Sequence, residues 1–148
     1  MFREKIYPYV LVFFQLGSLA VIFLTGPWLA GTWDGIVVEM AGVVLGIVAI
    51  YVAGIHNVNI APRPKNGGVL ITSGPYRQIR HPMYLAQVVA VIPLVLSDFT
   101  WFRLAVLLTL VVALLLKMPY EEKGLVRQFG DDYLMYKEQT KKVLPFLY

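Results

Sequence analysis

Residues 74–97 read GPYRQIRHPMYLAQVVAVIPLVLS, a polar stretch that becomes almost wholly apolar from Pro82 onward. Proline suits the first position of a helix because its missing N–H has no intrahelical partner there. Arg80 and His81 lie directly before this change, and ionisable groups beside a membrane-spanning segment are costly, so they usually mark a functional site. The stretch therefore predicts a membrane helix that begins at Pro82 and has chemistry at its N-terminal end.

The rest of the chain is also rich in apolar segments. The 148 residues are 58% hydrophobic and only 15% charged, which is unusual for a small soluble domain. A helix needs roughly 20 apolar residues to cross a bilayer. We therefore predict an all-α, polytopic membrane protein that forms one domain over residues 1–148. Its four predicted spans cover about 7–30, 36–55, 82–97 and 99–118, of which the third is short.

The basic residues are distributed unevenly between the predicted loops. Twelve of the 13 Lys and Arg residues fall before the first span, between the second and third, or at and after the end of the fourth; Arg103 is the exception. The positive-inside rule then predicts that both termini are cytoplasmic. The net charge of +4 suits anionic lipid headgroups rather than nucleic acid. The chain has no cysteine, which excludes disulfides and thiolate ligands.

Two polar segments on the predicted cytoplasmic side are candidates for a binding site. The connection 56–81 is long and rich in proline and glycine, and loops of this length in compact proteins are usually functional. After the fourth span, apolar and aromatic residues recur at helical spacing and predict an amphipathic helix over about 120–141 that lies on the membrane or folds back over the loop. These residues are Leu125, Phe129, Tyr133 and Tyr136.

Small and polar residues inside the first two spans predict how the helices meet. Gly42 and Gly46 are four residues apart, a spacing that lets membrane helices approach closely. Gln15 is open to two interpretations, because it can line a substrate pocket or form a hydrogen bond between helices. The first two spans therefore contribute mainly packing, and Gln15 is their candidate for contact with a ligand.

The adjacent acids Glu121 and Glu122 end the fourth span on the same side as His81. A carboxylate there can pair with an ammonium or sulfonium group or accept a hydrogen bond from a hydroxyl. The alternative is a solvated pair that neutralises neighbouring lysines. Arg80 likewise either binds a small carboxylate or phosphate near the N-terminus of the third span or only anchors the protein at the membrane. The two histidines and this pair of acids match no metal-ligand spacing, so no metal site is predicted.

Several short motifs follow one another in a defined order along the second half of the chain. They are Leu70-Ile71-Thr72-Ser73-Gly74-Pro75-Tyr76, Arg80-His81-Pro82-Met83-Tyr84, Glu121-Glu122-Lys123-Gly124-Leu125 and Phe129-Gly130-Asp131-Asp132-Tyr133, then Tyr136 and Pro145. Together they resemble the isoprenylcysteine carboxyl methyltransferase family and its phospholipid methyltransferase relatives. The resemblance covers about residues 69–146, over half of the chain, and the order makes it specific although each motif is weak alone.

The resemblance implies a membrane-embedded methyltransferase that uses S-adenosylmethionine. The cofactor is expected in a cytosol-facing pocket made by the long loop, the third span and the helix after the fourth. By position, the residues expected to contact the cofactor are Gly68, Val69, Leu70, Ile71, Tyr76, His81, Pro82, Met83, Tyr84 and Glu121. Lys117 corresponds to the family's substrate-contacting base, which is often Arg, and Arg80 is a second expected contact of the acceptor. The family often has His at the position of Gly68.

The expected reaction is methyl transfer to a lipophilic acceptor, either a small molecule or a lipid-modified substrate, that arrives between the spans. Displacement at a sulfonium needs no metal, because alignment and desolvation of the nucleophile supply much of the acceleration. A carboxylate acceptor needs no base, whereas an amine or thiol would use His81 or Glu122 as the catalytic base. Two alternatives stay open: an NADPH-dependent membrane reductase of the steroid 5-alpha-reductase type, and a non-catalytic four-helix protein that binds membrane lipids.

Overall fold

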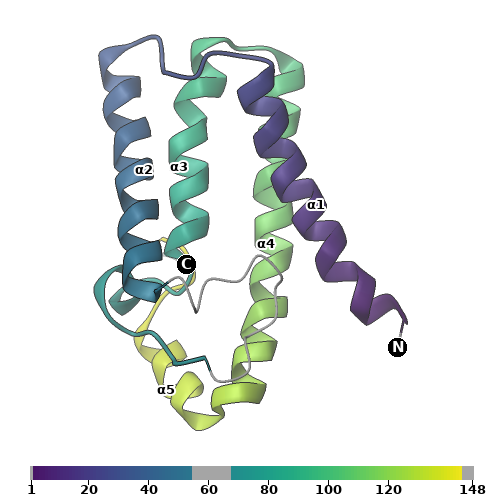
Figure 1. The fold of residues 1–148 in the computed structure, drawn as a ribbon, viewed down its shortest axis with the longest axis vertical. Coiled ribbons are helices and arrows are strands. Elements are labelled where there is room, and N and C mark those ends of the chain that lie inside the picture. The colour runs from purple at the N-terminus through teal and green to yellow at the C-terminus, as the bar shows by residue number, and fades with distance from the viewer. Residues whose placement is uncertain (1, 55–67, 145–148) are drawn as a thin grey trace.

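The protein is a bundle of helices with a small cap at one end (Figure 1). The computed structural model describes residues 2–54 and 68–144. Their elements are α1 (Phe2–Leu24), α2 (Trp33–Ala53), the 3₁₀ turn η1 (Gly74–Arg77), α3 (Pro82–Ser97), α4 (Trp101–Phe129) and α5 (Asp131–Gln139). The four longer helices run alongside one another, while η1 and α5 gather at one end. The predicted all-α fold is confirmed for the described residues.

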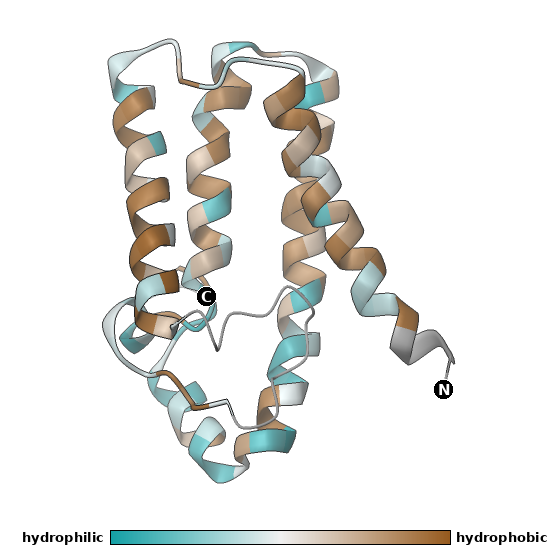
Figure 2. Ribbon diagram, in the orientation of Figure 1, coloured by the Kyte–Doolittle hydropathy of each residue, from teal (hydrophilic) through white to brown (hydrophobic). Residues whose placement is uncertain are grey.

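The lengths and hydropathy of the helices are those of a polytopic membrane protein. Within the described ranges, three helices are long and apolar enough to cross a membrane, namely α1 over Ile6–Leu24, α2 and α4. Figure 2 shows apolar residues along most of each of them. The helix α3 has the predicted bounds but only 16 residues, which is about 24 Å of helix against a hydrocarbon layer of roughly 30 Å.

Some helix ends differ from the sequence-based expectation, and local chemistry explains why. The first span was expected to reach residue 30, but α1 ends at Leu24 because Gly26 precedes Pro27, and a residue before proline disfavours helical backbone. The fourth was expected to end at 118, yet α4 continues through Pro119. The helix expected over 120–141 is therefore divided between α4 and α5 by Gly130, whose φ of 56° suits glycine.

The four long helices pack as two pairs. The helix α2 packs closely against α3, α1 packs against α4, and α1 and α2 have almost no direct contact. The first pair is close because a Cβ on Gly42 would lie 2.5 Å from the main-chain nitrogen of Ala90, as the glycine spacing predicted. Residues from α1, α3 and α4 form the core, among them Ile22, Val91 and Leu110.

The two ends of the bundle have different polar groups. We call the end with connections 25–32 and 98–100 the turn end, and the end with η1 and α5 the site end. At the turn end, Arg103 is 2% exposed and donates a hydrogen bond to the carbonyl oxygen of Leu94 at 2.9 Å. Buried Glu39 accepts a hydrogen bond from the main-chain nitrogen of Ala30 at 2.9 Å. These buried charges are thus bonded to the main chain of neighbouring segments.

Candidate active site

A cavity of about 550 Å³ lies at the site end and extends between the helix pairs. Its volume falls within the range of pockets that hold small-molecule ligands. The wall includes every residue that the sequence assigned to the cofactor: Gly68, Val69, Leu70, Ile71, Tyr76, His81, Pro82, Met83, Tyr84 and Glu121. Lys117 and Arg80, expected at the acceptor, also line it, whereas Glu122 does not. Their roles toward a ligand stay predictions.

The cavity also contains residues that sequence reasoning did not assign to it. Five come from α2, which lines the cavity with small and aliphatic residues, and others come from α1, α3, α4 and α5. These residues are Leu16, Gly42, Val43, Gly46, Ile50, Ala53, Ala86, Gln87, Ala90, Leu125, Gln128, Phe129, Tyr133 and Tyr136. The helical spacing of the aromatic residues near the C-terminus was the available signal for that part of the wall. Apart from Gln15, nothing in the first two spans distinguished lining residues from lipid-facing ones.

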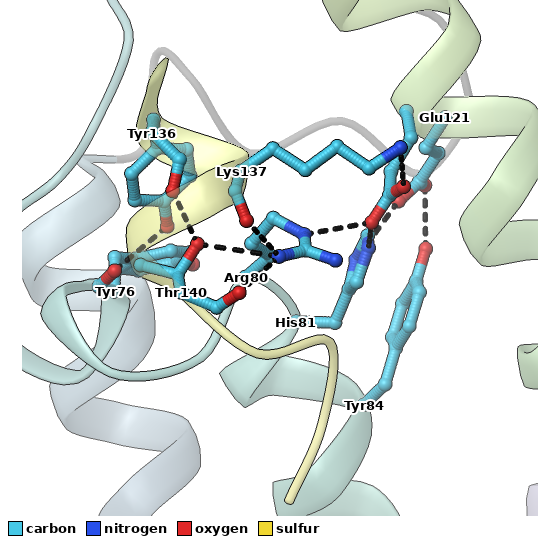
Figure 3. Close-up of polar contacts among 9 residues, drawn as sticks. Tyr76, Arg80, His81, Tyr84, Glu121, Tyr136, Lys137 and Thr140 are labelled. Atoms are coloured by element: carbon cyan, nitrogen blue, oxygen red, sulfur yellow. Dashed lines mark hydrogen bonds and ion pairs between the residues drawn. The ribbon is translucent and has the colours of Figure 1, made fainter. Parts of the chain in front are cut away.

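Glu121 is the acid that faces the cavity. Its side chain is 21% exposed, and its Oε1 accepts a hydrogen bond from the hydroxyl of Tyr84 at 2.5 Å. The Nζ of Lys117 lies 3.8 Å from the same oxygen and 5.2 Å from the centre of the Tyr84 ring. The Nδ1 of His81 lies 3.7 Å from Glu121 Oε2, and its ring stacks on Tyr84 at 5.3 Å (Figure 3). One carboxylate therefore organises three cavity-lining side chains.

Glu122 points away from the cavity wall into a buried ion-pair cluster. Its Oε1 accepts a hydrogen bond from Arg80 Nε at 2.8 Å, and both side chains are only 6% exposed. His81 Nε2 lies 3.4 Å from the same oxygen, and Lys137 Nζ lies 3.4 Å from Oε2. Arg80 Nη1 also donates to the carbonyl oxygen of Thr140 at 2.5 Å (Figure 3). The guanidinium group thereby joins α4 to the segment that follows α5.

The segment after α5 pairs with the chain that leads into α3. Ile79 and Lys141 form a parallel bridge. The main-chain nitrogen of Arg80 donates to the carbonyl of Lys141 at 2.8 Å, and that of His81 donates to the carbonyl of Lys142 at 3.0 Å. These bonds fix the backbone of His81 next to the start of α3.

Tyrosines from η1 and α5 form part of the cavity wall at the site end. The hydroxyl of Tyr136 donates to the carbonyl oxygen of Tyr76 at 2.7 Å. Burial, aided by Glu122 and opposed by Arg80, raises the pKa of Tyr136 to about 12. The pKa of Tyr76 is also raised, mainly by burial and further by Tyr136 and Glu121. Both phenols are therefore protonated hydrogen-bond donors at neutral pH.

The geometry defines a polytopic membrane protein with a ligand-sized cavity at one end of its bundle, whose mainly apolar wall includes Arg80, Lys117 and Glu121. Residues 30–132 match the phospholipid methyltransferase family, to which the chain belongs. The chain is also 30% identical over 125 residues to the protein-S-isoprenylcysteine O-methyltransferase of Xenopus laevis. That match covers 76% of this chain but 40% of the relative. The resemblance found in the motifs is confirmed, and the chain is an integral membrane protein of a methyltransferase family.

Proposed function

We propose that this protein transfers a methyl group from S-adenosylmethionine to a lipophilic acceptor at the site end of the bundle. The observation that carries the proposal is the cavity of about 550 Å³, because its wall gathers all the residues that the family resemblance assigns to the cofactor. Nine of them lie within residues 68–84, and Glu121 joins them from α4. A shared wall is expected if they bind one ligand, and it has no comparable explanation in a protein that only binds membrane lipids.

The side chains of the wall fit the chemical groups of S-adenosylmethionine. Glu121 supplies a partly exposed carboxylate for a positively charged group. Tyr76 supplies a protonated phenol, and the surrounding aliphatic side chains, such as Leu70 and Met83, supply apolar surface for the adenine ring. When bound, the cofactor supplies an electrophilic methyl group. The residues of this chain hold it, exclude water and align the acceptor.

The acceptor is expected to carry an apolar chain and to enter from the bilayer. The cavity reaches α1 and α2 through Leu16, Val43 and Ile50, and these two helices have almost no direct contact. A lipid tail between them would meet mainly apolar side chains, which agrees with substrates of lipid type in the family. Because alignment and desolvation contribute much of the rate of such displacements, a cavity bounded by helices and lipid suits the reaction.

His81 is our candidate for the base when the acceptor must lose a proton. Its ring lines the cavity and lies between the carboxylates of Glu121 and Glu122, at 3.7 Å and 3.4 Å. The position of Glu122 behind the wall supports a positioning role toward His81 and Arg80 in place of direct contact with the acceptor. An acceptor carboxylate would need no base, so the two cases differ in their dependence on His81.

Calorimetric titration in detergent tests the cofactor. We expect S-adenosylhomocysteine to bind and NADPH not to bind, with a gain of about 2.7 kcal/mol in unfolding free energy at 100 times the dissociation constant. His81→Ala and Tyr76→Ala should weaken this binding, while Gln139→Leu, an exposed change on α5, serves as control. Binding of NADPH alone would support the reductase alternative, and binding of neither would overturn the proposal.

We further propose that the site end faces the cytosol. The chain lacks cysteine, so single cysteines introduced at exposed Thr72 and Asp98 can report the side of each end. A membrane-impermeant maleimide added to intact cells should label Asp98→Cys and leave Thr72→Cys unlabelled until the cells are opened. The reverse pattern would contradict this orientation.

A further inference from the structure

A second polar cluster lies deeper in the cavity than Glu121 and joins three helices. Lys117 Nζ on α4 donates to Gln15 Oε1 on α1 at 2.9 Å, and Gln15 Nε2 donates to Gln87 Oε1 on α3 at 2.8 Å. Lys117 and Gln15 are 3% and 6% exposed, and all three side chains line the cavity. The cluster therefore lines the same cavity as the residues expected to bind the cofactor.

The donor and acceptor inventory fixes the direction of this chain of hydrogen bonds. A lysine ammonium has only donors, so the oxygen of the Gln15 amide must face Lys117. The NH₂ group of Gln15 then faces Gln87 and must meet its oxygen. The remaining NH₂ group of Gln87 has no acceptor among the residues that the structure describes, although the side chain lines the cavity.

The surroundings make an amide donor at this place unusual. Gln87 is one helical turn beyond Met83 and Tyr84 on α3, and the nearby wall of α2 and α3 consists of small residues such as Gly46 and Ala90. Polar groups within membrane helices are expensive and are usually paired or functional. A network that only joins helices is complete with Lys117, Gln15 and the oxygen of Gln87, so the NH₂ group of Gln87 remains available to a ligand in the cavity that its side chain lines.

We propose that Gln15 and Gln87 position the methyl acceptor. Gln15 holds the Lys117 ammonium in place and orients Gln87, whose NH₂ group donates to an oxygen of the acceptor beside that ammonium. This inference rests on the proposed function and adds to it a preference for an acceptor that presents an anionic or carbonyl oxygen. An acceptor ammonium would meet two donors and a like charge there.

The test uses N-acetyl-S-farnesylcysteine, which has an apolar tail and a carboxylate, and S-farnesylcysteamine, which has the same tail and an amine. Gln87→Leu should raise the KM for the carboxylate probe by about tenfold, equivalent to about 1.4 kcal/mol, with kcat changed less. Gln15→Leu should have at least the same effect because Lys117 loses its 2.9 Å hydrogen bond to Gln15 and Gln87 loses the donor that orients its amide. The matched change Gln139→Leu, on the exposed end of α5, should leave KM unchanged.

Three further readouts separate positioning from a structural role and from failure of the proposed function. The Kd for S-adenosylhomocysteine should change less than about twofold in both variants, a bound well below the tenfold loss expected for one hydrogen bond to a charged group. The farnesylcysteamine probe should bind weakly to the wild-type protein, and its affinity should not fall in the Gln15→Leu and Gln87→Leu variants. Direct calorimetry of the carboxylate probe without cofactor should show the same tenfold loss, even if no methyl transfer is detected. Three outcomes would overturn the positioning role. The variants could bind the carboxylate probe as tightly as the wild-type protein does, or the wild-type protein could fail to bind it. The variants could also lose affinity for the probe and for S-adenosylhomocysteine in parallel.

Discussion

Buried arginines occur at both ends of the bundle, but their partners differ. At the turn end, Arg103 donates to the main-chain carbonyls of Leu94 and Ile22, and no carboxylate of the described residues forms an ion pair with it. At the site end, Arg80 donates to Glu122 at 2.8 Å and borders the cavity. Burial of a charge in a membrane protein therefore does not by itself mark a site. Carboxylate partners beside a cavity distinguish the two ends.

The position of Arg103 has a structural explanation. The last four carbonyls of a helix lack intrahelical partners, and Ile22 and Leu94 lie in the last turns of α1 and α3. Arg103 Nη1 lies 3.4 Å from the first carbonyl oxygen, and Nη2 lies 2.9 Å from the second. One guanidinium from α4 therefore joins two helix ends by hydrogen bonds to carbonyl groups near their C-termini.

The largest expected effect is a difference in stability between variants of the two arginines. It arises because Arg80 has a charged partner and Arg103 has neutral ones. Arg80→Met removes the closest partner of the buried Glu122 carboxylate and leaves it with His81 and Lys137, each at 3.4 Å. Breaking a buried ion pair typically costs about 3–5 kcal/mol. Arg103→Met removes hydrogen bonds to neutral groups only, namely two carbonyls and the Thr25 hydroxyl, and should cost about 1–3 kcal/mol. Reversible unfolding in mixed detergent micelles measures both. The double variant Arg80→Met with Glu122→Met should recover most of the loss, and a double variant as unstable as the sum of the single ones would contradict this account.

The second prediction sharpens the comparison within the site end itself. Glu121→Gln should weaken S-adenosylhomocysteine binding by more than about tenfold, because loss of one charged partner in a desolvated site typically costs about 2–5 kcal/mol. Glu122→Gln should weaken binding less and destabilise the fold more, since Glu122 pairs with Arg80 and His81 behind the wall. Calorimetry and unfolding of both variants provide the measurement. A larger binding loss at Glu122 would mean that the two faces of α4 are assigned in the wrong order.

Much of the fold follows directly from the sequence because a bilayer permits few solutions. Apolar runs of sufficient length must form helices in lipid, and the bounds of α3 agree with the predicted ones. Adjacent helical residues point about 100° apart, so Glu121 and Glu122 cannot both face one pocket. Only Glu121 lines the cavity.

Other parts of the site could not be predicted because they depend on long-range pairing. Arg80 was expected to contact the acceptor, but nothing in the sequence indicates that its Nε meets Glu122 or that its Nη1 meets the carbonyl of Thr140. The two interpretations of Gln15 were both open, and the structure contains both, since it bonds Lys117 and lines the cavity. Hydropathy indicates whether a residue prefers an apolar or an aqueous environment, and it carries no information about which helix lies opposite.

A third prediction uses the contact between α2 and α3, which lies between the two ends and contains no charge. Gly42→Ala places a Cβ 2.5 Å from the main-chain nitrogen of Ala90, so the helices must separate, at a cost of about 1–3 kcal/mol. Gly46→Ala places its Cβ 3.4 Å from that of Ala86 and should be tolerated within about 0.5 kcal/mol. Unfolding of the pair in detergent gives the difference. Equal losses would show that the close approach at Gly42 does not stabilise the bundle.

The smallest expected effect concerns the second cation that meets Glu122. The Nζ of Lys137 lies 3.4 Å from its Oε2, but the lysine side chain is 44% exposed, against 6% for Arg80. Exposed ion pairs contribute about 0–1 kcal/mol and weaken with salt. Lys137→Met also keeps the main-chain carbonyl that accepts a hydrogen bond from Arg80 at 3.1 Å.

Lys137→Met should therefore lower the unfolding free energy by less than about 1 kcal/mol, and the difference from the wild-type protein should shrink as ionic strength rises. The matched measurement is the unfolding of Arg80→Met at the same salt concentrations, where the loss should persist because that pair is shielded from solvent. If both variants lost the same stability and showed the same salt dependence, burial would not be what distinguishes the two cations of Glu122. The contrast between the turn end and the site end would then have to rest on the number of charges alone.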